Sequence, residues 1–197
     1  MPSGEMEGRV DALFSTPLWR IRCPVHERIK PPLIAEIERM RLDPRQKSDE
    51  QRSNIGGWRS ADLPLDHSPW REFAEFVHGC VMGILNQDVP FVLQAWVNLH
   101  DRNGYNRSHV HPGCLLSGVY YLRAPEGSGA IILEDPRPQA AFQALHDVCR
   151  LSLEESKAVV PAREGMLLLF PSWLSHSTEP NGAESSRISI PVNVMPR

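Results

Sequence analysis

The sequence predicts a mainly β protein of the sandwich or barrel type, with helices confined to its first half. After residue 90, short runs rich in valine, isoleucine, leucine and aromatic residues alternate with turn-forming clusters. The chain also contains 18 prolines and 13 glycines, which favours turns between short strands over a helical bundle. Its 197 residues with 41% hydrophobic content fit one globular domain. We therefore expect a single domain over 1–197, with an N-terminal strand and supporting helices in 1–90 and the β core in 91–197.

The chain is predicted to begin with an edge strand and a first amphipathic helix. Residues 13–22 look like a short strand interrupted by Pro17, and proline restricts a strand to the edge of a sheet. Residues 32–42 place apolar side chains at helical spacing with glutamate and arginine between them. We expect this helix to start near the proline pair at 31 and 32 and to end before Pro44.

A polar loop and a second helix are predicted to follow. Residues 43–60 are polar and lack apolar periodicity, which indicates a loop. Ser68 is a favourable N-cap, and Pro69 suits the first turn of a helix that ends near Asn86. An apolar stripe runs along this helix, and we expect that stripe to cover one face of a sheet. It comprises Trp70, Phe73, Phe76, Val77, Val81 and Ile84.

The second half is predicted to consist of short strands. The candidate strands are 91–99, 115–123, 129–134, 166–170 and 187–195. Glycine, asparagine and proline clusters indicate turns at 101–108, 124–129 and 179–186. The long segment 138–164 is less regular, and we expect part of 147–157 to be helical.

Charge and cysteine content narrow the class of protein. The formal net charge of −3 gives no electrostatic case for binding nucleic acid or an anionic membrane. No apolar run reaches the roughly 18–20 residues that span a bilayer, and the first residues lack the apolar stretch of a signal peptide. The four cysteines are scattered, with no C-x-x-C pair. We expect a cytoplasmic protein whose thiols stay reduced.

Three histidines form a candidate metal site. His109 and His111 are separated by one residue, so on an extended chain their side chains point to the same side, about 7 Å apart at Cα. Imidazole suits iron, zinc, copper or nickel, but a lone H-x-H pair also occurs by chance on surface strands. His176 follows an apolar strand and a Pro-Ser turn, where it is either a surface residue or a third ligand at the end of the sheet. The three together favour the metal site.

Arg187 and Ser189 form a candidate anion site. They alternate with Ile188 and Ile190, so one face of this strand is apolar and the other carries the arginine and the serine. Such a strand lies either at an exposed edge or along a pocket. In a pocket, the guanidinium and the hydroxyl would bind a carboxylate through charge-assisted hydrogen bonds.

These motifs resemble a known family. The sequence HVHPGCLLSGVYYLRAPEGSGAIILEDPR, followed by LLLFPSWLSHSTEPN and RISIPVNV, looks like the iron(II)/2-oxoglutarate-dependent oxygenases. It is most similar to an uncharacterised bacterial and phage branch with H-x-H-P, F-P-S-x-L-x-H and R-x-S motifs. The resemblance covers about 91–195, and LFSTPLW near the start is also similar.

The resemblance implies a double-stranded β-helix (jelly-roll) core with helices packed on one face. It implies a dioxygenase with Fe(II) and 2-oxoglutarate as cofactors, which oxidises a substrate and releases succinate and carbon dioxide. His109, His111 and His176 would bind the iron. The distal carboxylate of 2-oxoglutarate would be held by Arg187 and Ser189, with Tyr121 and Asn98 lining the same pocket.

One position departs from the family pattern. The family usually has a carboxylate two residues after the first histidine, whereas this chain has His111 there. Three neutral imidazoles would leave an iron(II) site with a charge of about +2 in place of +1, which strengthens the binding of anionic ligands. Asp101 and Asp135 are alternative carboxylates, but neither has the H-x-D spacing.

We expect the substrate to be a small molecule or a peptide, and a homodimer is compatible with the sequence. Candidate contacts with the substrate are the 43–60 segment, Tyr105, Arg137 and Trp173, although Trp173 could equally pack on the sheet.

Two other functions compete with the oxygenase. The first is a cupin-type metalloenzyme with three histidines that does not use 2-oxoglutarate, but this class would give Arg187 and Ser189 no role and expects a glutamate after the histidine pair. The second is a β-sandwich binding module without catalysis, in which the three histidines would lie apart or bind no metal.

Overall fold

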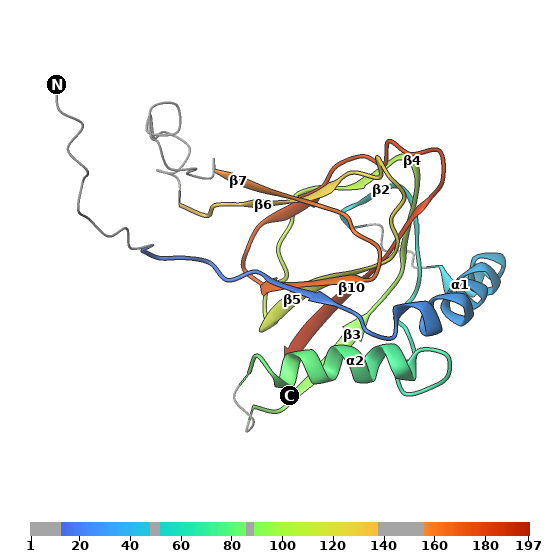
Figure 1. The fold of residues 1–197 in the computed structure, drawn as a ribbon, viewed down its shortest axis with the longest axis horizontal. Coiled ribbons are helices and arrows are strands. Elements are labelled where there is room, and N and C mark those ends of the chain that lie inside the picture. The colour runs from blue at the N-terminus through green and yellow to red at the C-terminus, as the bar shows by residue number, and fades with distance from the viewer. Residues whose placement is uncertain (1–12, 48–51, 86–88, 138–155) are drawn as a thin grey trace, which may run out of the picture.

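Two antiparallel sheets form the body of the protein (Figure 1). The computed structural model describes residues 13–47, 52–85, 89–137 and 156–197. The seven-stranded sheet has the order β1-β8-β5-β10-β4-β2, with β3 pairing to β10, and the smaller sheet has the order β7-β6-β9. The strands of the large sheet are β1 (Trp19–Arg22), β2 (Asn54–Arg59), β3 (Phe91–Ala95), β4 (Asn98–Asn106), β5 (Leu116–Arg123), β8 (Met166–Pro171) and β10 (Arg187–Pro196). Those of the small sheet are β6 (Ala130–Glu134), β7 (Lys157–Pro161) and β9 (His176–Thr178).

The space between the sheets holds one of two apolar cores. Val119 and Tyr121 of β5 and Phe170 of β8 pack there against Ile131 and Leu133 of β6. Neighbouring residues of the same large-sheet strands point to the opposite face, as strand geometry requires. The protein therefore has the predicted jelly-roll core, with its interior between the two sheets.

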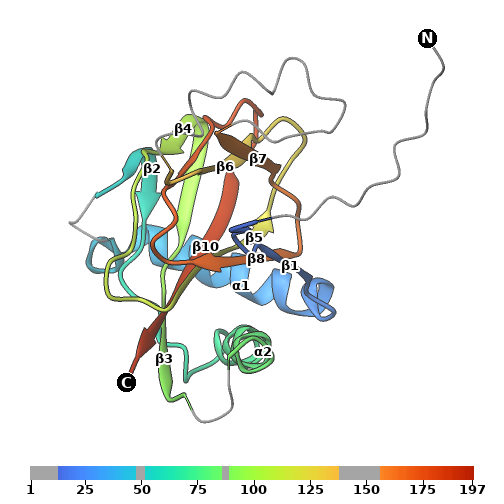
Figure 2. The same cartoon turned by 90° about the vertical axis from the view of Figure 1, so that its left-hand side faces the viewer.

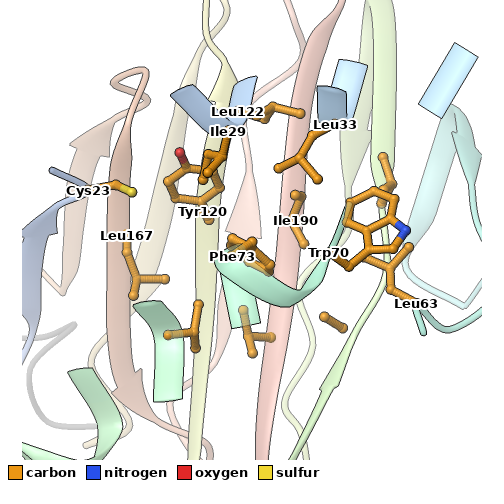
Figure 3. Close-up of a cluster of buried hydrophobic side chains, with 14 of the residues drawn as sticks. Cys23, Ile29, Leu33, Leu63, Trp70, Phe73, Tyr120, Leu122, Leu167 and Ile190 are labelled. Carbon is orange, nitrogen blue, oxygen red and sulfur yellow. The ribbon is translucent and has the colours of Figure 1, made fainter. Parts of the chain in front are cut away.

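Both helices cover the outer face of the large sheet, on the side away from β6 and β7 (Figures 1 and 2). They are α1 (His26–Leu42) and α2 (Arg71–Met82). Figure 3 shows the second apolar core, where Ile29 and Leu33 of α1 and Phe73 near the start of α2 surround Tyr120 and Ile190 of the sheet. This confirms the prediction that the helices pack on one face.

The first helix is longer than predicted. It begins at His26, so Pro31 and Pro32 lie inside α1 and not at its start. Both prolines are exposed, and each lacks the N–H that an interior helical residue donates to the carbonyl four residues earlier. The buried stripe already starts at His26 and Ile29, and this burial extends the helix before the prolines.

The second helix is shorter than predicted. It begins at Arg71 with Trp70 as the N-cap residue, so Ser68 does not cap it, and it ends at Met82. The predicted end near Asn86 lies at the border of residues outside the described part of the chain. The apolar stripe itself is confirmed, because Phe73, Val77 and Val81 are buried.

The predicted loop over 43–60 contains a strand. Within it, Pro44–Gln46 form a short 3-10 helix and β2 pairs with β4 in an antiparallel ladder. This strand was not predicted because the two glycines of NIGGWR break the alternation of apolar and polar residues. β4 in turn continues through most of the turn predicted at 101–108, with Asn103 at a positive φ of 67°. The expected strand 91–99 is thus divided into β3 and β4.

Gly57 is required by the close approach of β2 to β4. A Cβ atom at this position would lie 2.5 Å from Cδ2 of His100 and 2.8 Å from the carbonyl oxygen of Leu99. We predict that Gly57→Ala lowers the free energy of unfolding by about 2 kcal/mol, because the overlap includes rigid backbone. Urea unfolding measures it, with Gly79→Ala as the control, since a Cβ there meets nothing within 4 Å. A Gly57→Ala protein as stable as the wild type would contradict this packing.

The remaining predictions concern the second half. The strands at 115–123, 129–134, 166–170 and 187–195 and the turns at 124–129 and 179–186 are confirmed. β7 and β9 were not predicted, and most of the helical segment expected in 147–157 lies outside the described residues, while Lys157 begins β7. Among the described residues, no helix combines the length and the apolar character needed to cross a bilayer.

Candidate metal and co-substrate site

His109, His111 and His176 converge at one end of the jelly-roll interior. His109 follows β4 and forms an isolated bridge with His176 at the start of β9, each N–H donating to the other's carbonyl at 3.0 Å. The backbone N–H of His111 donates to the carbonyl of Ser172 at 3.1 Å, which ties the pair to the loop before β9. One ligand nitrogen from each imidazole lies within 4.8 Å of the others. This spacing fits three ligands of one metal ion.

The protonation of the imidazoles also suits a metal. Nδ1 of His109 lies 2.7 Å from the carbonyl oxygen of Arg107, and Nδ1 of His176 lies 2.9 Å from that of Leu174. A carbonyl only accepts, so each Nδ1 carries the hydrogen and each Nε2 keeps its lone pair. Burial lowers the pKa of His109, lowers that of His111 to about 4 and lowers that of His176 to about 3. The three rings are therefore neutral ligands at pH 7.

A cavity of about 400 Å³ connects this cluster with the predicted anion site. All seven residues that the sequence assigned to iron and 2-oxoglutarate line it. They are His109, His111, His176, Arg187, Ser189, Tyr121 and Asn98.

Arg187 is a buried cation, only 1% exposed. Its guanidinium donates to the carbonyl oxygens of Ser128 and Glu179 and to Oγ1 of Thr178. These acceptors are neutral, and no carboxylate in the described part of the chain forms an ion pair with it. Burial lowers its pKa, but a guanidinium stays charged in proteins. A buried, unneutralised cation facing a cavity favours an anionic ligand.

Three side chains form a row beside Arg187. Ser189 of β10 is paired with Asn98 on β4 and with Tyr121 on β5. The Tyr121 hydroxyl is buried and has no hydrogen-bond partner among the described residues. Its pKa is raised to about 12 by burial, against the opposing charge of Arg187. A buried hydroxyl without a partner is costly, so this donor also fits a ligand that accepts a hydrogen bond.

His100 contacts Arg187, a role that no sequence motif predicts. The Asn54 amide donates to the carbonyl of Gly57 at 2.9 Å, so its Oδ1 accepts from Nε2 of His100 at 2.6 Å. Nδ1 of His100 then faces Nη2 of Arg187 as an acceptor at 3.5 Å. Burial and the charge of Arg187 lower the pKa of His100 to about 4, which keeps the ring neutral.

Three of the predicted substrate contacts, Tyr105, Arg137 and Trp173, do not line the cavity. Tyr105 lies on β4 opposite Ile55, Arg137 pairs with Asp135, and Trp173 is 53% exposed. The alternative carboxylates are also engaged elsewhere, since Asp101 accepts from Ser186 and Asp135 from Arg137.

Several other residues that line the cavity were not predicted by name. Arg52, Ser53 and Arg59 line it, and they belong to the 43–60 segment that was predicted to contact a substrate. Trp96 and Arg107 line it as well: Trp96 directly follows β3 and Arg107 directly follows β4. The pairing of β2 with β4 brings Arg52, Ser53 and Arg59 toward the histidines, and no local pattern in the sequence encodes that pairing.

Three convergent imidazoles and a buried arginine thus line one cavity of the jelly roll, an arrangement suited to a metal ion and an anionic ligand. A family profile described as "Putative 2OG-Fe(II) oxygenase" matches residues 94–193, more than half of the chain. The chain therefore belongs to this family of iron(II)/2-oxoglutarate-dependent oxygenases. It is an enzyme with Fe(II) and 2-oxoglutarate as cofactors, so the cupin and binding-module alternatives are set aside. A search of curated protein sequences found no match.

Solved structures agree on the fold. A prolyl-4-hydroxylase from Pseudomonas putida is 15% identical, with a TM-score of 0.64 over 93% of this chain and 94% of that one. The epimerase SnoN from nogalamycin biosynthesis is 16% identical, with a TM-score of 0.69 over 92% and 78%. HygX from Streptomyces hygroscopicus, solved with nickel and 2-oxoglutarate, is 16% identical, with a TM-score of 0.59 over 92% and 83%. At such identities the likeness establishes the jelly-roll fold alone.

Proposed function

We propose that this oxygenase binds its Fe(II) through His109, His111 and His176, without a protein carboxylate. The observation that carries the assignment is the three neutral imidazoles, whose ligand nitrogens lie within 4.8 Å of one another in the cavity that also contains Arg187. No aspartate or glutamate belongs to this cluster within the described residues. Protein ligands from three positions leave room for other ligands on the metal.

The same cavity holds the proposed co-substrate site. Arg187 supplies the positive charge for the distal carboxylate of 2-oxoglutarate, and the Tyr121 hydroxyl, which has no partner among the described residues, donates to it. Ser189 lies between Tyr121 and Asn98 in the sheet, so its hydroxyl belongs to the same row. A carboxylate here would neutralise the buried cation and satisfy the buried hydroxyl together.

The protein's part in the reaction is to bind, orient and exclude water. When bound, Fe(II) and 2-oxoglutarate supply the oxidising chemistry, in which 2-oxoglutarate and dioxygen yield succinate and carbon dioxide as the substrate is oxidised. Nδ1 of His100 accepts from the Arg187 guanidinium and orients it, and the backbone bridge between His109 and His176 fixes the positions of two ligands. The apolar walls from Phe170 and Ile131 keep the interior dry.

Oxidation coupled to 2-oxoglutarate is tested by product analysis. Purified protein with Fe(II), ascorbate and 2-oxoglutarate in air is expected to release succinate and carbon dioxide in equal amounts, slowly without substrate. The protein with Zn(II) in place of Fe(II) is the control. Protein fully loaded with Fe(II) that never consumes 2-oxoglutarate, with or without candidate substrates, would contradict the proposal.

His111→Asp tests the unusual third ligand. We expect this variant to keep Fe(II) binding but to bind 2-oxoglutarate about tenfold more weakly, because the site loses one positive charge near an anionic ligand. Anaerobic titration of 2-oxoglutarate into Fe(II)-loaded wild type and variant measures the difference. Equal or tighter binding by His111→Asp would show that the charge at residue 111 does not govern co-substrate affinity.

We further propose a cytoplasmic enzyme that acts as a single domain. The supporting observations are the dispersed cysteines, of which Cys23, Cys80 and Cys114 are free thiols in the described residues, and the apolar core in which both helices pack on the sheet.

A further inference from the structure

His109 and His176, two of the proposed metal ligands, lie on short segments. His109 lies three residues after the end of β4, and β9, which begins with His176, is only three residues long. An isolated bridge with two backbone hydrogen bonds joins the two segments. Backbone that is held by few hydrogen bonds opens readily unless side chains support it. The contacts beside this bridge therefore decide how firmly the two ligands are positioned.

Glu134, the last residue of β6, accepts hydrogen bonds from both sides of the bridge. Its Oε2 atom accepts from Oγ of Ser175 at 2.7 Å and from Oγ of Ser108 at 3.0 Å. Ser175 directly precedes His176, and Ser108 directly precedes His109. One carboxylate oxygen thus connects the two residues that lie next to the ligands.

The acceptor at Glu134 is needed by the two serines. Their hydroxyl oxygens lie only 2.8 Å apart, so the three oxygens form a triangle that shares two hydroxyl hydrogens. Ser175 donates to the carboxylate over the shortest of the three distances, and Ser108 donates either to the carboxylate or to Ser175. In both arrangements the triangle requires an oxygen from residue 134, because the two hydroxyls alone would leave one hydrogen without an acceptor.

The backbone and the charge of Glu134 agree with this role. Its N–H donates to the carbonyl of Ser175 at 2.9 Å, beside the pairing of Leu133 with His176 in the β6–β9 ladder. The hydrogen bond from Ser175 lowers the pKa of the Glu134 carboxyl, and burial opposes this effect. The group is therefore ionised at pH 7, and its other oxygen, Oε1, lies 3.7 Å from Nζ of Lys157.

We propose that Glu134 is a positioning residue for the metal site, which holds the bridge between His109 and His176 in place through the two serine hydroxyls. The inference rests on the proposed function, because it requires these histidines to bind Fe(II). Glu134 acts through an acceptor oxygen and not through its charge. Both hydroxyls use Oε2, and the amide group of glutamine keeps such an oxygen.

The Fe(II) affinities of two variants test the inference. Glu134→Ala is expected to weaken Fe(II) binding by about tenfold, the lower end of the effect of residues that support metal ligands. Glu134→Gln is expected to stay within about threefold of the wild type, because it keeps the acceptor. Anaerobic equilibrium dialysis measures both. The absorption spectrum of the Co(II)-loaded protein, which reports ligand geometry, should change in Glu134→Ala and not in Glu134→Gln, whereas a loss of overall stability alone would leave the spectrum of the folded protein unchanged.

Ser175→Ala tests whether the carboxylate acts through this hydroxyl. Alone, the variant is expected to weaken Fe(II) binding by about fivefold. Added to Glu134→Ala, it should weaken binding by less than about twofold further, because both changes remove the same hydrogen bond. Ser175→Ala removes one hydroxyl only, so it keeps the test valid even if Glu134→Ala fails to fold.

Two variants of other charged pairs serve as controls. Lys157→Gln removes the ion pair at Oε1 of Glu134 and leaves Oε2 to the serines. Glu36→Ala removes a half-buried carboxylate on α1 that accepts from Arg39. Both should bind Fe(II) as the wild type does.

The outcomes separate this inference from the proposed function. Wild-type Fe(II) affinity in folded Glu134→Ala or in Ser175→Ala would overturn the positioning role of Glu134 alone. So would a Glu134→Gln protein that binds Fe(II) as weakly as Glu134→Ala, or additive losses in the double variant. Failure of the wild type to bind Fe(II), or unchanged Fe(II) binding in His176→Ala, would overturn the proposed metal site as well.

Discussion

His176→Ala is expected to weaken Fe(II) binding by on the order of 100-fold or more. The substitution removes one of the three neutral nitrogens that would bind the metal. With two imidazoles left, water takes the place of the third ligand, so Fe(II) dissociates more readily. Equilibrium dialysis against Fe(II) under anaerobic conditions measures the change.

The control for this variant is His67→Ala, which removes an exposed histidine paired with Asp66. It should bind Fe(II) as the wild type does. Circular dichroism of the metal-free proteins establishes that His176→Ala is folded, because the bridge between residues 109 and 176 is made by backbone atoms that alanine retains. A folded His176→Ala protein with wild-type Fe(II) affinity would remove His176 from the metal site.

Arg187→Gln is expected to weaken the binding of 2-oxoglutarate by on the order of 100-fold, while Fe(II) still binds. Glutamine can replace some hydrogen bonds of the guanidinium but not the buried charge that a carboxylate would neutralise. The affinity of Arg187→Lys for 2-oxoglutarate should lie between those of the wild type and Arg187→Gln, because lysine keeps the charge but lacks the planar guanidinium. Titration of 2-oxoglutarate into the Fe(II)-loaded variants gives the affinities.

Arg20→Gln, an exposed arginine on the edge strand β1, serves as the control for Arg187. Retained Fe(II) binding by Arg187→Gln shows that the jelly roll is intact. If the glutamine variant then bound 2-oxoglutarate as tightly as wild type, the co-substrate would have to be anchored elsewhere in the cavity.

The parts of the fold that were predictable are those in which burial and local pattern agree. β5, β6, β8 and β10 are apolar runs between turn residues, and each was predicted to within a few residues. β2 was missed because Gly56 and Gly57 give it no apolar alternation, and its stability comes from pairing with β4. The early start of α1 was missed because proline is a local signal, while the packing of Ile29 against the sheet is not.

The residues of the site also separate into those that local sequence patterns predict and those that depend on strand pairing. His109, His111, His176 and Arg187 were predicted because their spacing on extended chain is itself informative, and the structure brings them to one cavity. The role of His100 depends on Asn54 and Arg187 from two other strands, so no sequence spacing could reveal it. Arg59 was hidden for the same reason, within a segment without recognisable strand character.

Whether metal and co-substrate share one site is tested most directly by an anaerobic titration of the wild-type protein with Fe(II) and 2-oxoglutarate, monitored by visible absorption. We expect a weak charge-transfer band that requires both additions and saturates at one equivalent of each per chain, because the three histidines and Arg187 belong to one cavity. A protein that takes up one equivalent of Fe(II) and gives no band with saturating 2-oxoglutarate would contradict it.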